Sequence, residues 1–301
     1  MTPKNPSSTP SGFRTALLAR LRNRAAAEGL AVQRLQQRVA FERLLARLAP
    51  VGDWVLKGGF ALELRYGWTS RPTKDLDLRT ATMLEASLER LRASVATSEV
   101  GDHFSFELGA TAVEMQGAPG GTVRLPVTAR VAGAVFAQFS LDLSSSDVIV
   151  GDADELVGSD LLVFAGIAPI RFPVYPLPQQ LAEKLHAYTL PRTVENTRVK
   201  DLVDLVSIAK SDRVSGDQLL ASLRATFAVR ATHDCPAALP APPTSWGMAF
   251  RELSSATGMP VSTVQEGYEI AGRFWNPVLA GGVGGQSWDP GAQSWYHVSA
   301  E

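Results

Sequence analysis

The sequence has little of what several classes of protein need. Its 301 residues include one cysteine, Cys235, so neither an internal disulfide nor a zinc site built from cysteines can form. The four histidines show no metal-ligand spacing, and no Gly-x-Ser-x-Gly or Walker-type loop is present. No apolar run reaches the ~18 residues of a membrane span. We therefore expect a cytoplasmic protein, from a reducing compartment, that does not enter the membrane.

The composition is that of a folded protein, with 45% hydrophobic and 20% charged residues. At roughly 100–200 residues per domain, the length predicts about two domains. We expect a basic helical leader packed on the core over 1–50, a core over 51–150, and a mainly helical domain with a Gly-rich tail over 151–301. Residues 1–11 are polar and rich in Pro and Ser, which predicts disorder and no secretory signal.

Charge is unevenly distributed along the chain. The net charge is −1, but residues 1–50 hold nine Lys and Arg against two Glu, so the remaining residues sum to −8. A basic leader before an acidic body is compatible with a polyanion partner and a cation-binding centre. A solvated Arg-rich helix face explains the leader equally well, and both interpretations stay open here.

Apolar periodicity predicts helices, then a mixed α/β core, then more helices. Helices are expected over 13–28, 31–48, 60–66, 82–97, 180–188, 200–210, 215–228 and 262–275. Short strands are expected at 54–56 and 75–78, and three or four more between 104 and 143, joined around the turn 117–121. The Pro-rich segment 231–245 predicts a linker. The tail from residue 280, which contains Trp288 and Trp295, is expected to be poorly ordered or to bind a partner.

A pair of glycines follows the first predicted strand, in Lys57-Gly58-Gly59. Two glycines between a strand and a helix let backbone N–H groups approach phosphate oxygens without a Cβ in the way. The helix that follows would add its positive end at the same point. A plain turn is the alternative interpretation of such a pair.

Acidic side chains alternate with leucines in the next predicted strand. Asp75 and Asp77 share one face of that strand, because residues two apart point the same way. Adjacent carboxylates repel unless a cation lies between them, and Mg²⁺ prefers one or two carboxylates together with water and phosphate oxygens. Asp142, in an otherwise apolar strand, would add a third carboxylate and complete a centre for two-metal nucleotidyl transfer. The alternative is a set of acids at a solvated strand edge.

Two later helices carry charges in unusual places. Lys184 lies within an apolar helical stretch, where an ammonium group needs a carboxylate or phosphate partner. Asp201 and Asp204 lie three residues apart on one helical face, and Arg198 lies three residues before Asp201. These positions fit phosphate binding, or a structural salt bridge between Lys184 and Asp204.

Five segments together resemble the AbiEii/AbiGii toxin family of nucleotidyltransferases, and the basic leader with Arg34-Leu35-Gln36 and the length resemble its mycobacterial MenT branch. The motifs span about residues 55–210. They are Lys57-Gly58-Gly59, Arg65-Tyr66-Gly67, Thr73-Lys74-Asp75-Leu76-Asp77-Leu78, Leu181-Ala182-Glu183-Lys184-Leu185-His186-Ala187 and Arg198-Val199-Lys200-Asp201-Leu202-Val203-Asp204-Leu205.

The resemblance implies a polymerase-β-like α/β core of mixed sheet with N-terminal helices and a C-terminal helical domain. It also implies a toxin of a toxin–antitoxin system that uses Mg²⁺ and transfers nucleotides from an NTP, with CTP or another pyrimidine nucleotide as a candidate. MenT-like members extend the 3′ end of tRNA and so block aminoacylation and translation. The same centre could instead modify a small molecule or a protein hydroxyl, or the chain could bind nucleotide or RNA without catalysis.

Carried over by position, the resemblance assigns roles to individual residues. The catalytic residues would be Asp75, Asp77, Lys184 and Asp204, and the metal ligands Asp75, Asp77 and Asp142. The nucleotide-binding residues would be Lys57, Gly58, Gly59, Thr73, Lys74, Lys184 and Arg198. Many nucleotidyltransferases have Gly-Ser where this chain has Gly58-Gly59, and the third acid varies among relatives. A cognate antitoxin is expected; it could act by phosphorylating Thr73, which would place negative charge beside the triphosphate.

Overall fold

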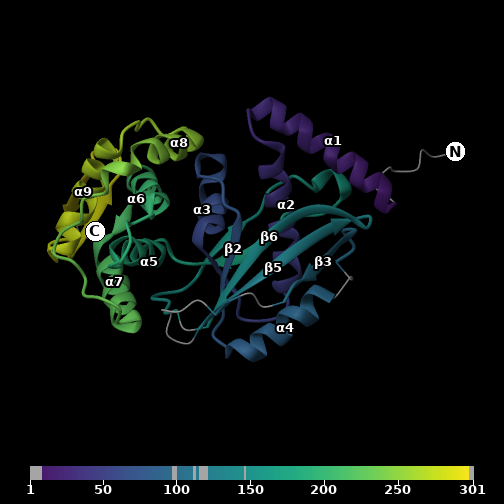
Figure 1. Cartoon of the computed structure of the whole chain (residues 1–301), viewed down its shortest axis with the longest axis horizontal. Coiled ribbons are helices and arrows are strands. Elements are labelled where there is room, and N and C mark those ends of the chain that lie inside the picture. The colour runs from purple at the N-terminus through teal and green to yellow at the C-terminus, as the bar shows by residue number, and fades with distance from the viewer. Residues whose placement is uncertain (1–8, 97–99, 111–112, 115–120, 146, 298–301) are drawn as a thin grey trace. The chain divides into compact units, whose positions relative to one another are not determined.

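The computed structural model describes residues 9–96, 100–110, 113–114, 121–145 and 147–297. The chain forms two compact units (Figure 1), each described here by itself. Unit 1 consists of Met1–Arg65, Thr73–Ser146 and Glu155–Val174, and unit 2 of Tyr66–Pro72, Asp147–Asp154 and Tyr175–Glu301. The expected turn at 117–120 and most of the expected disordered leader lie outside the described residues.

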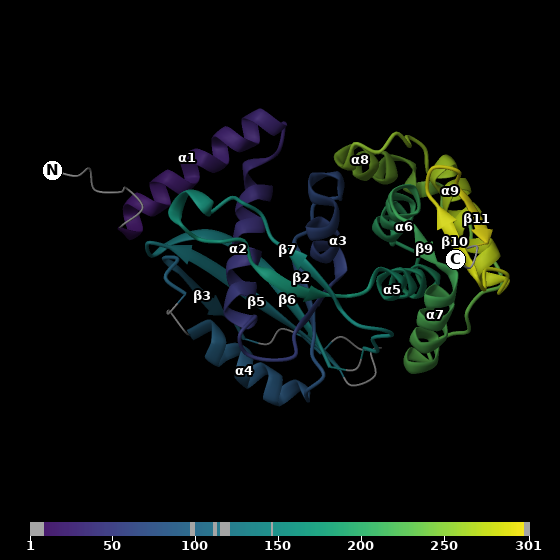
Figure 2. The ribbon, with the colours of Figure 1, turned by 180° about the vertical axis from the view of Figure 1, so that it is seen from behind.

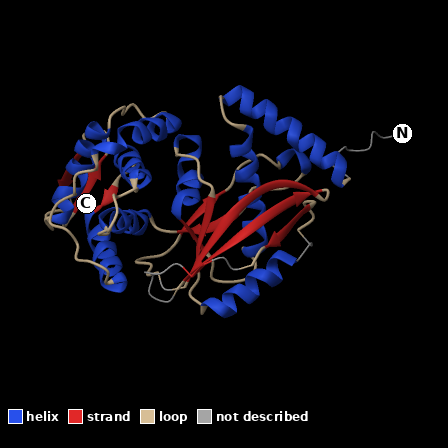
Figure 3. Cartoon of the chain, in the orientation of Figure 1, coloured by secondary structure: helices blue, strands red, loops and turns tan. Residues whose placement is uncertain are grey.

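Unit 1 combines a mixed sheet with helices (Figure 3). Its strands are β1 (Val55–Lys57), β2 (Asp75–Arg79), β3 (Phe104–Leu108), β4 (Val113–Glu114), β5 (Thr122–Val131), β6 (Ala134–Ser144), β7 (Asp154–Val157) and β8 (Arg171–Val174). Its helices are α1 (Pro10–Glu28), α2 (Val32–Leu48), α3 (Gly58–Tyr66), α4 (Leu84–Ala96) and the short η3 (Val163–Ala165). The sheet order is β3-β5-β6-β2-β1-β8-β7, and β4 pairs with β5.

The two faces of this sheet differ in polarity. Leu76 and Leu78 of β2 and Leu141 of β6 are fully buried. On the same face of β6, Phe139 meets Phe41 of α2, with ring centroids 4.8 Å apart. Figure 2 shows α2 crossing this side of β5 and β6. The alternating residues of β2 and β6 therefore point to the opposite face, which carries the acidic side chains.

Part of the basic charge of residues 1–50 lies inside unit 1. Arg38 donates through Nε to Glu42 Oε1 at 3.0 Å. Arg43 and Arg47 both bind the carboxylate of Asp102, at 2.6 and 2.8 Å. Arg43 and Arg47 thus tie α2 to the segment that leads into β3, whereas Arg38 pairs within α2, and all three arginines are buried. The exposed arginines of the leader lie on α1: Arg20, Arg22 and Arg24.

Unit 2 is mainly helical. Its helices are η2 (Gly67–Thr69), α5 (Leu177–Thr189), α6 (Val199–Ser211), α7 (Gly216–Arg230), η4 (Thr244–Trp246), α8 (Gly247–Thr257) and α9 (Val264–Leu279). Its strands β9 (Val214–Ser215), β10 (Gln286–Asp289) and β11 (Ser294–His297) form a small antiparallel sheet. Each helix expected from the sequence is present with ends shifted by a few residues, whereas α8 was not expected. No described helix is long and apolar enough to cross a bilayer.

The tail of the chain is folded, whereas the sequence predicted poor order there. Residues 286–297 form the hairpin β10–β11 instead of a poorly ordered strip. Trp288 is fully buried, and its Nε1 donates to the Ala209 carbonyl oxygen at 2.7 Å. Trp295 Nε1 donates to the Phe274 carbonyl oxygen at 2.9 Å. The glycines that suggested disorder precede the hairpin, whose tryptophans close the core of unit 2.

Candidate active site

Charged residues form a row across four neighbouring strands of unit 1. The register places Lys57 of β1 opposite Asp77 of β2, Asp77 opposite Asp142 of β6, and Asp142 opposite Arg124 of β5. Residues opposite one another in register share a face of the sheet. Asp75, two residues before Asp77, shares it as well. The structure thus brings the three aspartates of the sequence analysis onto one face, here called the acidic face.

Gly58 lies directly against this face. Its φ of +68° is in the left-handed region that favours glycine, and a Cβ there would collide with the carboxylate of Asp77. The backbone at the start of α3 therefore approaches the Asp77 side chain closely. The start of a helix also carries unpaired N–H groups and partial positive charge. Gly58 therefore forms a turn and also lets the backbone come close to the carboxylate of Asp77.

Arg124 is a member of the acidic face that the sequence analysis missed. Its Nε donates to Asp142 Oδ1 at 2.7 Å and its Nη2 to Asp142 Oδ2 at 2.6 Å. The hydrogen bond to Asp142, together with the charges of Asp142, Asp75 and Asp77, raises the pKa of Arg124 although burial opposes this. One guanidinium therefore interacts with all three aspartates. The available signal was the alternation of Arg124 with the apolar Val123 and Leu125.

The acidic face fits a divalent cation at two of its three aspartates. Carboxylate oxygens of Asp75 and Asp77 suit Mg²⁺, which completes its shell with water and phosphate oxygens. Among the described residues, no three Asp, Glu, His or Cys side chains converge to hold one metal ion. Both oxygens of Asp142 accept hydrogen bonds from Arg124 in this structure, and the role of Asp142 as a third metal ligand stays a prediction.

The other nucleotide-binding residues expected in unit 1 lie beside this face. Thr73 and Lys74 lead directly into β2, and the Thr73 hydroxyl donates to the Asp75 carbonyl oxygen at 3.3 Å. Thr73 is half-buried and Lys74 is exposed, while Gly59 is buried within α3. A phosphate group on Thr73 would therefore stand next to Asp75.

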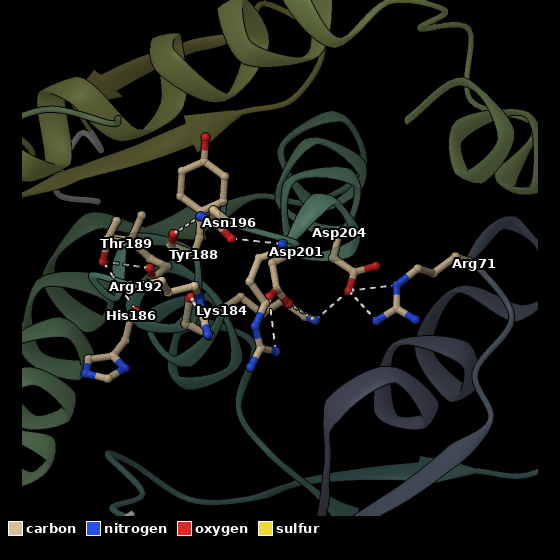
Figure 4. Close-up of polar contacts among 12 residues, drawn as sticks. Arg71, Lys184, His186, Tyr188, Thr189, Arg192, Asn196, Asp201 and Asp204 are labelled. Carbon is tan, nitrogen blue, oxygen red and sulfur yellow. Dashed lines mark hydrogen bonds and ion pairs between the residues drawn. The ribbon is translucent and has the colours of Figure 1, made fainter. Parts of the chain in front are cut away.

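Unit 2 holds the second predicted cluster, which joins α5, α6 and the segment 66–72 (Figure 4). Lys184 Nζ lies 2.5 Å from Asp204 Oδ2 and 3.5 Å from Asp201 Oδ1. Arg71 donates to the same Asp204 oxygen through Nη2 at 2.9 Å and Nε at 3.1 Å. Arg198 Nη1 lies 3.6 Å from Asp201 Oδ2. The salt bridge between Lys184 and Asp204 is present, and Arg71 is a partner that the sequence analysis missed.

Electrostatics in this cluster favour a charged Asp204. Burial by itself raises the pKa of a carboxyl group, but the charges and hydrogen bonds of Lys184 and Arg71 more than offset it, so the pKa of Asp204 lies below its ordinary value. Three cations, those of Lys184, Arg71 and Arg198, thus surround two carboxylates.

The chain is similar to known proteins in sequence and in fold. The family described as nucleotidyl transferase AbiEii toxin, Type IV TA system, matches residues 40–262. MenT4, a nucleotidyltransferase toxin from Mycobacterium tuberculosis H37Rv, has a similar structure: TM-score 0.54, 19% identity, 89% of this chain and 98% of that chain covered. A protein from H. pylori described as a nucleotidyltransferase gives a TM-score of 0.44 at 14% identity, over 81% of this chain and 96% of that one. No curated protein matches the sequence.

The family match and the similarity to MenT4 confirm the expected fold class, and the family match defines the class of enzyme: the chain is a nucleotidyltransferase. The matched region covers nearly three quarters of the sequence and includes β1, β2, α5 and α6. The chain therefore belongs to the AbiEii family of nucleotidyltransferase toxins of toxin–antitoxin systems, and its fold is MenT-like.

Proposed function

We propose that this toxin uses Mg²⁺ to transfer nucleotides from an NTP to the 3′ end of tRNA, and so blocks aminoacylation and translation. The acidic face of unit 1 carries the proposal, because Asp75 and Asp77 lie on one strand with Gly58 against them. Membership of the AbiEii family supports it. A toxin of this family also implies a cognate antitoxin.

In this proposal Asp75 and Asp77 would hold the divalent ion, which would neutralise phosphate charge and lower the pKa of the attacking hydroxyl. The N-terminus of α3, with Gly58 and Gly59, and the Lys57 ammonium orient the triphosphate. The RNA 3′-oxygen forms a bond to the α-phosphorus while the bond from that phosphorus to the pyrophosphate oxygen breaks. The hydroxyl proton passes to water, and pyrophosphate leaves. Catalysis is mainly positioning and charge stabilisation.

The cluster of unit 2 contributes to phosphate binding in this proposal. By the family pattern, Lys184 would be a cation that contacts phosphate, and Arg198, whose side chain is 47% exposed, would be a second one. Asp204 and Arg71 orient Lys184, since Asp204 accepts hydrogen bonds from both. The catalytic requirement for Lys184 and Asp204 is inferred from the family pattern and the charge of the cluster.

The test is incubation of the protein with Mg²⁺, total tRNA and each labelled NTP separately, followed by mass spectrometry of the RNA 3′ ends. We expect label at tRNA 3′ ends from one nucleotide, with CTP or another pyrimidine nucleotide as the first candidate. Asp77→Asn should lower the transfer rate at least 100-fold, because one of two metal ligands is lost. Glu107→Gln, at an exposed position of β3 in the same unit, should leave the rate unchanged.

Other outcomes of this experiment would replace the proposal. If label enters protein or a small molecule and RNA stays unlabelled, the same centre transfers nucleotides to a hydroxyl of that acceptor instead. If the protein binds Mg²⁺ in the presence of NTP but transfers no nucleotide, it is a nucleotide-binding protein without catalytic activity. NTP and tRNA as substrates would also place the protein in the cytoplasm, where both are present.

Phosphorylation of Thr73 is the proposed action of the antitoxin. A phosphate there adds nearly two negative charges beside Asp75 and would repel an incoming triphosphate. We expect Thr73→Glu to weaken NTP binding at least tenfold in a titration with nucleotide. The matched control is Thr69→Glu, at an exposed threonine of η2. A Thr73→Glu protein with normal NTP affinity and activity would rule out this mode of neutralisation.

A further inference from the structure

The acidic face contains a resident cation. The guanidinium of Arg124 binds both oxygens of Asp142, at 2.7 and 2.6 Å, in the bidentate geometry that arginine and carboxylate prefer. The Asp142 side chain is 7% exposed and that of Arg124 38%. The carboxylate is therefore buried, while the positive group that neutralises it stands at the surface of the face.

The position of this pair is set by the sheet and not by a flexible loop. Arg124 and Asp142 are direct partners in the antiparallel register of β5 and β6, and Asp142 is the direct partner of Asp77 in the parallel register of β2 and β6. Arg124, Asp142 and Asp77 thus follow one another across three hydrogen-bonded strands. Moving the guanidinium away from Asp142 would leave a buried carboxylate without its cation.

A divalent cation and Arg124 compete for the same carboxylate. An ion coordinated by Asp142 would lie within a few ångströms of the guanidinium and be repelled by it. The aspartates of β2 keep the arrangement that suits Mg²⁺, on the same face as Arg124.

We propose that Arg124 takes the place of a second divalent cation at the acidic face. The site then binds one divalent ion, at Asp75 and Asp77, and Asp142 is a positioning residue that holds the guanidinium beside it. This inference rests on the proposed function and refines it from a two-metal to a one-metal centre.

The geometry also gives Arg124 a role toward substrate. Arginine has five N–H donors, and the two bonds to Asp142 use two of them. The other three meet no acceptor among the described residues, so they remain for an anionic oxygen of the bound nucleotide. A guanidinium suits this role because it stays charged at every relevant pH and binds phosphate through two N–H groups.

The experiment counts metal ions with Mn²⁺, by electron paramagnetic resonance of the free ion during a titration without nucleotide. We expect one Mn²⁺ per wild-type chain and none with Asp75→Ala/Asp77→Ala. Arg124→Gln should bind two, because Asp142 is released and becomes a ligand. Arg124→Lys should bind one, because it keeps a cation at the position. The control is Arg130→Gln. Arg130 lies on β5, as Arg124 does, and pairs with Glu107 of β3, so this variant should also bind one Mn²⁺.

A double variant keeps the test valid if Arg124→Gln folds poorly. Arg124→Gln/Asp142→Asn replaces the ion pair by two amides and should bind one Mn²⁺, with a circular dichroism spectrum like that of the wild type. Two ions on the wild-type chain, or one on a folded Arg124→Gln protein, overturn the inference and leave the metal site at Asp75 and Asp77 intact. A wild-type chain that binds no Mn²⁺ overturns that metal site, and this inference with it.

Discussion

At the scale of single residues, Asp204 is a buried carboxylate that binds two cationic side chains. One of its oxygens accepts hydrogen bonds from both Lys184 and Arg71, and all three side chains are nearly buried. Replacement of a whole buried ion pair by well-packed apolar residues often changes the free energy of unfolding little. Removal of one partner alone is strongly destabilising, because it leaves a buried charge without compensation. Asp204 therefore stabilises unit 2 whether or not it also takes part in catalysis.

We expect Asp204→Asn to lower the free energy of unfolding by about 3 kcal/mol, because two cations lose their carboxylate. Urea unfolding followed by tryptophan fluorescence measures this, since five of the six tryptophans lie in unit 2. Glu269→Gln, at an exposed position of α9, is the control and should change stability by less than about 0.5 kcal/mol.

The same comparison has a pH dependence of known sign. The pKa of Asp204 is depressed in the folded chain, so its stabilisation is present above the ordinary value of 3.8 and is lost as pH falls through the lower folded-state value. The difference between wild type and Asp204→Asn should therefore narrow below about pH 4. A difference that is constant from pH 7 to pH 3 would contradict an ionised Asp204 as its source.

At the scale of elements, the hairpin β10–β11 completes the core of unit 2. Trp288 packs against two other aromatic rings, at centroid distances of 4.9 Å to Phe274 and 5.6 Å to Trp295, which also contact each other. β10 also pairs with β9, so the hairpin is tied to the chain segment before α7. A segment with these contacts is part of the fold and not an appendage.

We expect Trp288→Ala to destabilise the chain by about 3–5 kcal/mol, because a buried indole and its hydrogen bond to Ala209 are both lost. Thermal unfolding followed by near-ultraviolet circular dichroism is the measurement. Tyr296→Ala, on the same hairpin at a position that is 36% exposed, should have a much smaller effect. An effect of Trp288→Ala as small as the one expected for Tyr296→Ala would mean that the hairpin contributes little to the core.

At the scale of the whole molecule, the distribution of positive charge decides where RNA could bind. The basic leader was compatible with a polyanion partner, yet Arg38, Arg43 and Arg47 are buried in ion pairs. Of the arginines of α1, Arg20 stacks on the ring of Phe164 with 4.4 Å between its guanidinium carbon and the ring centroid, and Arg24 pairs with Glu28. An RNA contact by the leader therefore depends on a small exposed set.

We expect the triple variant Arg20→Gln/Arg22→Gln/Arg24→Gln to weaken tRNA binding and to reduce the salt dependence of its affinity. Each lost phosphate contact lowers the magnitude of the slope of log K against log salt by roughly 0.7–0.9, so the loss of three contacts lowers it by roughly 2.1–2.7. Fluorescence anisotropy at salt concentrations of about 50 to 200 mM measures the affinity and its salt dependence. Arg224→Gln/Arg251→Gln/Arg273→Gln, exposed in unit 2, is the control of equal charge. Equal losses in both variants would assign binding to net charge alone.

The predictions from sequence were most accurate where the signal is local. Helix ends such as Gly29, the strand of Asp75 and Asp77, and the turn at Gly58 follow from periodicity and backbone preference over a few residues. The prediction of a poorly ordered tail was wrong because local evidence does not show which distant segments a tryptophan packs against. A glycine-rich stretch indicates flexibility, whereas the burial of Trp288 depends on α9 and β9, which are distant in the sequence.

The sequence by itself determined which residues can do chemistry: paired aspartates, a glycine turn, and a lysine and an aspartate on apolar helices. Only the tertiary structure decided which charges neutralise which. Arg124 reaches Asp142 because two strands pair in one register, and Arg71 reaches Asp204 across 133 residues of sequence. The physical reason is that charges act through space at a few ångströms, and the chain separation of two residues does not fix that distance.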